Sequence, residues 1–238
     1  MCDRRSTITL KIMIGIIAAM APEADLLRNA LSPSQTREIW GLSFTSGTLE
    51  GRQVVVLQCG IGKVNAAIGT ALLIQLFQPK AILNTGSAGG LLASQSFGEV
   101  VVSTAVLHHD VDVEAFGYAP GQVPGLPARF EADPALVSLA DQCLEGEPHT
   151  KGIIGSGDVF VHEAQRIAEI RRRFPDLCAV EMEGSAIAQT CFLANIPFVV
   201  VRALSDIAGS ESPLKFDEFL PLASQNSSRL VRAMLRQL

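Results

Sequence analysis

The sequence predicts a single α/β domain built on a central mixed β-sheet flanked by helices. Short apolar runs without alternation recur along the chain, and such runs are typical of strands covered on both faces. Segments with helical periodicity separate many of these runs, so strands and helices alternate. No repeat, charge run or low-complexity linker divides the 238 residues. We therefore expect one domain at residues 13–238, preceded by a flexible tail at residues 1–12.

The composition narrows the class of protein. Apolar residues make up 48% of the chain and charged residues 18%, which allows a substantial buried core. The longest apolar runs, Ile12–Ala21 and Ala66–Phe77, are too short or too interrupted to span a bilayer. A formal net charge of −5 without a basic stripe makes nucleic acid an unexpected partner. Five cysteines without CxxC spacing fit reduced thiols in a cytoplasmic protein.

The N-terminus permits a second interpretation. Arg4 and Arg5 before the run Ile12–Ala21 loosely imitate a signal peptide. Cleavage after Ala21 would delete a strand that the sheet needs, so we expect that run to begin the core instead. Met1 and Met13 both stay open as the native start.

The expected strands are apolar runs bounded by turn residues. Two of them alternate and are joined by Glu50-Gly51-Arg52, which predicts an antiparallel hairpin. The strands are predicted at Met13–Ala19, Trp40–Leu49, Gln53–Gln58, Ala81–Asn84, Gly98–Ser103, Gly152–Gly155, 178–181 and Pro197–Leu204.

The expected helices have apolar residues at helical spacing, and Pro22 suits the first turn of the first one. A long segment rich in Gly, Pro and aromatic residues, His108–Pro127, should instead be a functional loop. The helices are predicted at 22–31, Val64–Phe77, Pro134–Leu144, His162–Phe174, Gly184–Ala194 and Phe216–Leu238.

Carboxylates gather where two of these strands end. Glu181 and Glu183 are two positions apart, so in extended geometry they would share a face. Ser205 and Asp206 follow the last predicted strand. Ligands bind beside the carboxyl ends of strands in an open α/β sheet. Because carboxylates rarely lie near a core without partners or a task, the stretch from Cys178 to Asp206 is the expected centre of an active site.

Two glycine-rich segments follow other strands, at Thr85–Gly90 and Gly155–Phe160. Glycines let a ligand approach the backbone and leave N–H groups free to donate, although a tight turn would use the same residues. Phe160 could stack on a flat base.

Nucleotide and metal motifs fail at specific positions. Gly60-Ile61-Gly62 lacks the third glycine of a dinucleotide fingerprint, because position 65 is Asn. Val64 follows Lys63 where a Walker motif requires Ser or Thr. The adjacent residues His108 and His109 would point to opposite faces, and no second cluster completes a metal site. We therefore expect neither a cofactor nor a metal.

The motifs occur together in one order. They are Gly15-Ile-Ile-Ala-Ala-Met20 with Glu23, Gly60-Ile-Gly-Lys63, Asn84-Thr-Gly-Ser-Ala-Gly-Gly90, Gly155-Ser-Gly-Asp158, Val180-Glu-Met-Glu183 and Arg202-Ala-Leu-Ser-Asp206. With them the chain resembles the bacterial 5′-methylthioadenosine/S-adenosylhomocysteine nucleosidases of the nucleoside phosphorylase superfamily, over nearly its whole length.

This resemblance implies roles for the matching residues. Asp206 would protonate or hydrogen-bond N7 of the adenine leaving group, and Glu23 would deprotonate the attacking water. Glu183 would accept hydrogen bonds from the ribose hydroxyls. The other implied substrate contacts are Ser87, Ile61, Phe160, Val161, Met182, Arg202, Ser205 and Phe216.

The resemblance also implies a homodimer, in which Phe116 and Pro124 would line the 5′-substituent pocket of the neighbouring subunit. It departs from the family at Ala21 and Pro22, where acidic residues are common.

The chemistry suits these residue types. Cleaving an N-ribosidic bond creates an oxocarbenium-like sugar, so an acid is needed at the base and a second carboxylate at the water, roughly 6.5–9.5 Å or more apart. Asp206 should therefore have a pKa raised by burial, while Glu23 stays ionised.

Alternatives remain for the nucleophile and the substrate. The loops near Glu23 and Ser87 carry no basic residue, which favours water over phosphate as nucleophile. A phosphate-dependent phosphorylase, an aminodeoxyfutalosine nucleosidase and a non-catalytic purine-binding module stay open. The preferred 5′-substituent depends on residues 107–127 and 208–216.

Overall fold

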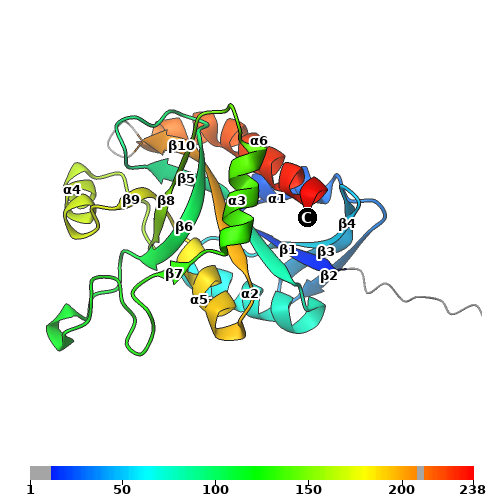
Figure 1. The fold of residues 1–238 in the computed structure, drawn as a ribbon, viewed down its shortest axis with the longest axis horizontal. Helices are drawn as coiled ribbons and strands as arrows, with labels where there is room; N and C mark the ends of the chain where they lie inside the picture. The colour runs from blue at the N-terminus through cyan, green and yellow to red at the C-terminus, as the bar shows by residue number, and fades with distance from the viewer. Residues whose placement is uncertain (1–11, 208–211) are drawn as a thin grey trace, which may run out of the picture.

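A mixed β-sheet runs through the centre of the computed structural model, which describes residues 12–207 and 212–238 (Figure 1). All of the predicted N-terminal tail except Ile12 lies outside the described residues. The strands are β1 (Met13–Ala18), β2 (Ser34–Ile39), β3 (Leu42–Leu49), β4 (Arg52–Gln58), β5 (Ala81–Gly90), β6 (Val100–His108), β7 (Phe130–Glu131), β8 (His149–Ser156), β9 (Leu177–Glu181) and β10 (Phe198–Ile207).

Helices cover both sides of the sheet. Helix α6 lies with α1 on one side, and α2 lies with α5 on the other (Figure 1). This arrangement confirms the predicted α/β class. The helices are α1 (Ala21–Arg28), α2 (Lys63–Phe77), the short 3₁₀ helix η1 (Glu114–Phe116), α3 (Pro134–Cys143), α4 (Ala164–Arg173), α5 (Gly184–Ala194) and α6 (Ser212–Gln237).

Half of the sheet closes on itself. Strand β5 pairs in parallel with β10 and antiparallel with β9. Strand β10 pairs with β6, which continues through β8 to β9. Five strands therefore form a ring, and β1, β4, β3 and β2 extend from β5 as an open wing. The expectation of an open sheet holds only for this wing.

The ends predicted for β5, β6 and β10 lie too early in the sequence. We expected β5 to end at Asn84 and Thr85–Gly90 to be a glycine-rich segment after it, but this segment completes β5 because its backbone pairs with β10 as far as Gly90. Strand β10 likewise continues to Ile207 and contains Ser205 and Asp206. The glycines of Thr85–Gly90 did not end the strand, because pairing with neighbouring strands satisfies the N–H and C=O groups of this segment.

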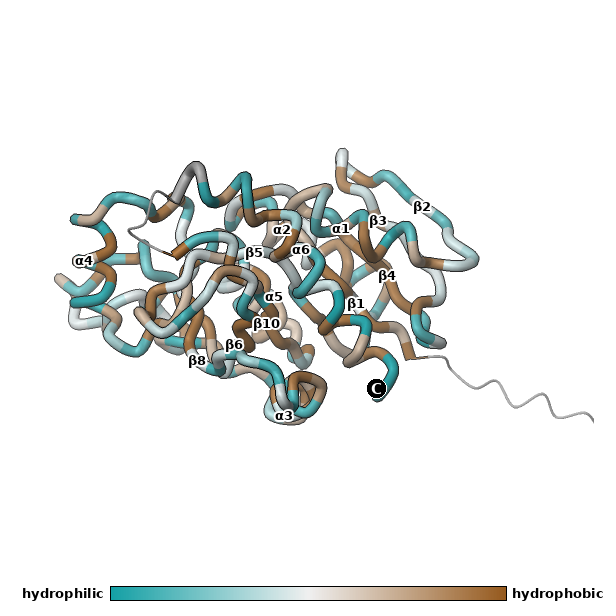
Figure 2. The backbone as a smooth tube through the Cα atoms, turned by 90° about the horizontal axis from the view of Figure 1, so that it is seen from above, coloured by the Kyte–Doolittle hydropathy of each residue, from teal (hydrophilic) through white to brown (hydrophobic). Residues whose placement is uncertain are grey.

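The wing contains a strand that the sequence did not predict. Strand β2 has five exposed polar residues and only one apolar residue, the half-buried Ile39, and Figure 2 shows the strand as mainly hydrophilic. Trp40 was assigned to a strand, but Trp40 and Gly41 form the turn between β2 and β3, with φ of 53° and 76°. The predicted hairpin is confirmed as β3 and β4, with Glu50 and Gly51 at the turn.

Further differences concern the loop after β6. His108, the predicted first residue of that loop, ends β6 and is buried. The loop then holds η1, and the unpredicted strand β7 pairs with β6 beyond it. None of the helices that the structure describes is long and apolar enough to cross a membrane.

Candidate active site

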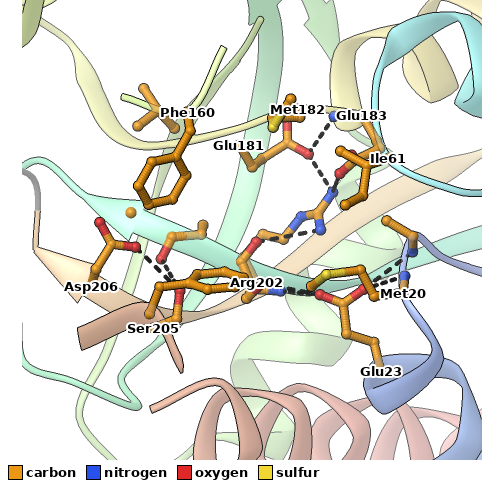
Figure 3. Close-up of a pocket in the computed structure, with 16 residues that line it drawn as sticks. Met20, Glu23, Ile61, Phe160, Glu181, Met182, Glu183, Arg202, Ser205 and Asp206 are labelled. Carbon is orange, nitrogen blue, oxygen red and sulfur yellow. Dashed lines mark hydrogen bonds and ion pairs between the residues drawn. The ribbon is translucent and has the colours of Figure 1, made fainter. Parts of the chain in front are cut away.

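One cavity of about 380 Å³ opens where β5, β9 and β10 meet the first turns of α1 and α5 (Figure 3). Its walls are mainly apolar, with carboxylates placed around them. Ten of the residues predicted for the site line it: Glu23, Ile61, Ser87, Phe160, Met182, Glu183, Arg202, Ser205, Asp206 and Phe216.

Glu23 lies in the first turn of α1, where it is only 2% exposed. Its Oε2 accepts hydrogen bonds from the backbone N–H groups of Ala19 and Met20, at 3.2 and 3.0 Å. Its Oε1 accepts from the N–H and the hydroxyl of Ser87, at 2.9 and 3.0 Å. Four donors on two oxygens suit an ionised carboxylate and fix its orientation.

Arg202 is the central cation of the site and is 1% exposed. Its Nη2 donates to Asn84 Oδ1 at 2.9 Å, to Glu181 Oε2, and to Glu183 Oε2 at 3.4 Å. Its Nη1 donates to the carbonyl of Ser87 at 3.4 Å. Burying one guanidinium among carboxylates is tolerable only because these pairs form.

A glycine makes room for this arrangement. A Cβ added at Gly86 would lie 2.3 Å from Arg202 Nη1 and 2.9 Å from Glu23 Oε1. Both side chains therefore approach the backbone of β5 closely, which explains the glycine inside this strand.

Glu181 and Glu183, next to the start of α5, accept hydrogen bonds from different donors. Glu181 accepts from the N–H groups of Glu183 and Gly184 and from the hydroxyl of Ser156, so its oxygens are occupied. Glu183 accepts from the N–H of Gly62 at 2.9 Å. Burial raises the pKa of Glu183 to about 7, against the lowering effect of Arg202, and the nearby charge of Glu181 raises it further.

Asp206 lies at the other end of the cavity from Glu23, below the ring of Phe160 (Figure 3). A register shift in β10 between Leu204 and Asp206 inserts Ser205 as an extra residue. Such a bulge redirects a side chain. The hydroxyl of Ser205 donates to Asp206 Oδ1 at 3.2 Å, and Asp206 is 2% exposed.

The wall near Asp206 is aromatic. The rings of Phe160 and Phe216 meet edge to face with centroids 5.8 Å apart, and Phe160 is 38% exposed. Val161 lines a small adjoining pocket with Phe160 and Asp206. A flat apolar ligand would fit against this wall and reach Asp206 with a polar edge.

Two predicted residues lie away from this cavity within the chain. Phe116 is 81% exposed, and Pro124 is exposed on the same loop. Their assignment to a neighbouring subunit stays a prediction. His108 and His109 are both buried, and His108 is hydrogen-bonded to Gln189 and Ser185. The described residues contain no group of three or more His, Cys, Asp or Glu that could hold a metal.

Several residues that line the cavity were not among the predicted site residues. Met20 donates its N–H to Glu23 and forms part of the wall, as do Ala19, Ala88, Gly89 and Val180. Met20 directly precedes a helix that begins with Ala and Pro. This position before the helix could have predicted that the Met20 N–H donates to a nearby acid.

Known proteins share this architecture over almost the whole chain. Residues 13–236 match the phosphorylase superfamily. A 5′-methylthioadenosine/S-adenosylhomocysteine nucleosidase of Anoxybacillus flavithermus is 50% identical over 228 residues, covering 94% of this chain and 98% of its own.

Two solved structures of such nucleosidases are also similar. The Colwellia psychrerythraea enzyme in complex with adenine has 47% identity and a TM-score of 0.94, covering 96% of both chains. The Neisseria meningitidis enzyme in complex with methylthio-immucillin-A has 45% identity and a TM-score of 0.93, covering 95% of this chain and 99% of its own. The chain therefore belongs to the phosphorylase superfamily and, within it, to the 5′-methylthioadenosine/S-adenosylhomocysteine nucleosidases.

Proposed function

We propose that this protein hydrolyses the N-ribosidic bond of 5′-methylthioadenosine and S-adenosylhomocysteine, and releases adenine and the 5′-substituted ribose. The observation that carries the proposal is the pair of buried carboxylates, Glu23 and Asp206, at opposite ends of one apolar cavity (Figure 3). The names of the relatives support the same reaction and substrates.

The proposed mechanism assigns one end of the sugar to each carboxylate. Adenine lies against Phe160, and Asp206 protonates or hydrogen-bonds its N7 as the bond breaks. Glu23 removes a proton from the attacking water, and Ser87 keeps Glu23 in place through two hydrogen bonds. Each proton transfer contributes on the order of 10²–10⁴-fold to the rate.

The ribose lies between these two ends. Glu183 accepts hydrogen bonds from the ribose hydroxyls while Gly62 N–H and Arg202 hold its carboxylate. Met182 packs against the sugar, and the sulfur-bearing side chain suits an apolar ring face. The oxocarbenium-like sugar is positively charged, so the carboxylates around it stabilise the transition state.

Water is the proposed nucleophile because the buried cation of the site is already paired. Arg202 donates to Glu181, Glu183 and Asn84. The cavity wall also carries Glu23, whose charge would repel a phosphate dianion. A phosphorylase would need free arginine or lysine donors at this place.

The decisive experiment measures adenine release from methylthioadenosine in phosphate-free buffer. We expect full turnover, without stimulation by added phosphate. Strict dependence on phosphate would support the phosphorylase instead. Binding of adenine nucleosides without turnover, together with an affinity unchanged in Asp206→Asn, would support the purine-binding module.

The active form in this proposal is a cytoplasmic homodimer in which Phe116 and Pro124 complete the neighbouring 5′-substituent pocket. The exposure of Phe116 in the single chain supports this arrangement. Parallel rates on methylthioadenosine, S-adenosylhomocysteine, 5′-deoxyadenosine and aminodeoxyfutalosine would define the preferred 5′-group.

A further inference from the structure

Three polar side chains outside the cavity join three segments of the site. Lys63 Nζ donates to Asp110 Oδ1 at 2.6 Å, and the backbone N–H of Lys63 donates to Asp158 Oδ1 at 2.7 Å. The N–H of Asp158 donates to Asp110 Oδ2 at 2.9 Å, which closes the group. We call these three residues, Lys63, Asp110 and Asp158, the lysine tie. They belong to the start of α2, the loop after β6 and the loop after β8.

Two of the contacts between the loop after β8 and other segments belong to this tie. Residues 157–163 form neither helix nor strand. Within the described part of the chain, three hydrogen bonds join this loop to segments other than the adjoining helix α4. One is from Gly157 N–H to the carbonyl of Glu181, and the other two involve Asp158. Val161 adds an apolar anchor in a cluster with Leu107 and Val180. The backbone that carries Phe160 and Val161 is therefore held by the hydrogen bonds of Asp158 before these residues and by the packing of Val161 itself.

The start of α2 depends on the same contacts. The N-cap residue Gly62 has no side chain, and the first turn of the helix contains no acidic residue. Its N–H groups are instead satisfied by carboxylates from other segments: Gly62 donates to Glu183, and Lys63 donates to Asp158. Both carboxylates face the positive end of the helix. A Cβ at Gly62 would lie 3.1 Å from Asp158 Oδ1, so the glycine also permits this close approach.

The lysine tie includes residues of two segments that were considered above as nucleotide and metal motifs. Gly60–Lys63 resembled a nucleotide fingerprint, and His108–Asp110 resembled a metal site. Ile61, inside the first motif, lines one wall of the cavity, and Phe160 lines another. Lys63 is bonded to the segments on both sides, with a side chain that is 19% exposed, against 24% for Asp110. Partial burial reduces the solvent screening of this ion pair.

We propose that Lys63, Asp110 and Asp158 are positioning residues for the purine end of the site. By joining the start of α2 to the loop after β8, the tie sets the spacing between the Ile61 wall and the Phe160–Val161 wall. It therefore controls how tightly adenine is held. Glu23 and Asp206, which transfer protons in the proposed mechanism, are held by other hydrogen bonds. This inference rests on the proposed function.

The first test is Lys63→Met, which removes the ammonium and keeps the backbone N–H donor to Asp158. The expected result is a rise of about 5- to 10-fold in both the KM for methylthioadenosine and the inhibition constant for adenine, as loss of roughly 1 kcal/mol predicts. The kcat should stay within about 2-fold, because Glu23 and Asp206 do not contact the tie. The matched control is Lys80→Met, an exposed lysine in the loop before β5.

The second test separates charge from hydrogen bonding at Asp158. Asp158→Asn keeps an oxygen that can accept from Lys63 N–H, whereas Asp158→Ala removes it. We expect the asparagine variant to lie between wild type and the alanine variant in adenine affinity. Asp112→Asn is the control, because this exposed residue on the same loop as Asp110 pairs with Arg173 instead. The double variant Lys63→Met/Asp110→Asn should weaken adenine binding no more than the stronger single variant.

The variants distinguish a positioning role of the lysine tie from its absence. Unchanged KM and adenine inhibition in Lys63→Met would overturn it, as would a loss confined to kcat or an equal effect of Asp112→Asn. If Lys63→Met shows no cooperative unfolding transition, the Asp158 series decides by the same criteria. If wild type binds adenine without hydrolysing any nucleoside, the proposed reaction fails, and equilibrium dialysis with adenine still tests the tie.

Discussion

Glu23 Oε1 accepts two hydrogen bonds from one residue, the N–H and the hydroxyl of Ser87, 64 positions further along the chain. Glu23 begins α1 and Ser87 lies within β5, so the contact joins a helix start to the centre of the sheet. Because the other carboxylate oxygen is held by Ala19 and Met20, the side chain has one orientation. The group that we propose to activate water is thus preorganised before substrate enters.

Glu23→Gln tests that role directly. The amide cannot take a proton from water, so kcat should fall by about 10²–10⁴-fold while adenine affinity changes little. Adenine release in a single turnover measures the effect. Asp25→Asn is the control, because that carboxylate pairs with Arg28 on the same helix and outside the cavity. Activity close to that of wild type in Glu23→Gln would refute the assignment.

Gly86→Ala tests the packing of the buried charges. The new Cβ would collide with Arg202 Nη1 and press on Glu23 Oε1, so both must move. Overpacking of this kind costs about 1–3 kcal/mol of unfolding free energy, and kcat should fall at the same time. Gly146→Ala provides the comparison, since its φ of 82° strains the backbone in open space. Denaturant unfolding and adenine release should show a stability loss in both variants and a kcat loss in Gly86→Ala alone.

Glu183 should give the protein a stability that declines as pH rises. Burial raises the pKa of this carboxyl from 4.5 to about 7, so between these values the folded state holds a proton that the unfolded state has released. The contribution is complete below about pH 4.5 and is lost as pH passes the folded value of about 7. Glu183→Gln should therefore flatten the decline in unfolding free energy between about pH 5 and about pH 7.5.

The control for that experiment is Glu50→Gln. Hydrogen bonds from Arg236 and Arg232 hold the pKa of Glu50 below its usual value, so its contribution is lost only as pH falls through that lowered pKa. The slope above pH 5 should match that of wild type in this variant. An unchanged slope in Glu183→Gln would instead mean that Glu183 is ionised across the whole range.

The sequence predicted the carboxylates of the site better than the strands that carry them. Glu181, Glu183 and Asp206 were recognisable because acids beside apolar runs are costly without a purpose. The resemblance implied separate tasks for Glu183 and Asp206, but it did not indicate that Arg202 contacts both glutamates, since no local spacing encodes that contact.

Strand limits failed for a related reason. Thr85–Gly90 has the composition of a turn, and only pairing with β10 on one side and β9 on the other makes it a strand. Strand β2 lacks an apolar face and gains its structure from pairing with β3. Both cases are tertiary effects that a local pattern does not contain. Closure of five strands into a ring belongs to the same class.

The proposed contribution of Phe116 to a neighbouring site can be tested with mixed dimers. Phe116→Ala alone should raise the KM for methylthioadenosine about 10-fold, as loss of one aromatic contact of roughly 1.4 kcal/mol predicts. Trp40→Ala removes a ring of matched exposure, 80% against 81%, and should leave KM unchanged. In a mixed dimer of Glu23→Gln and Phe116→Ala subunits, action across the interface places both defects in one site and leaves the other intact. Co-expression should then produce a kinetic phase with both the wild-type KM and the wild-type kcat per site. If Phe116 serves its own subunit, every site carries one defect and no such phase will appear.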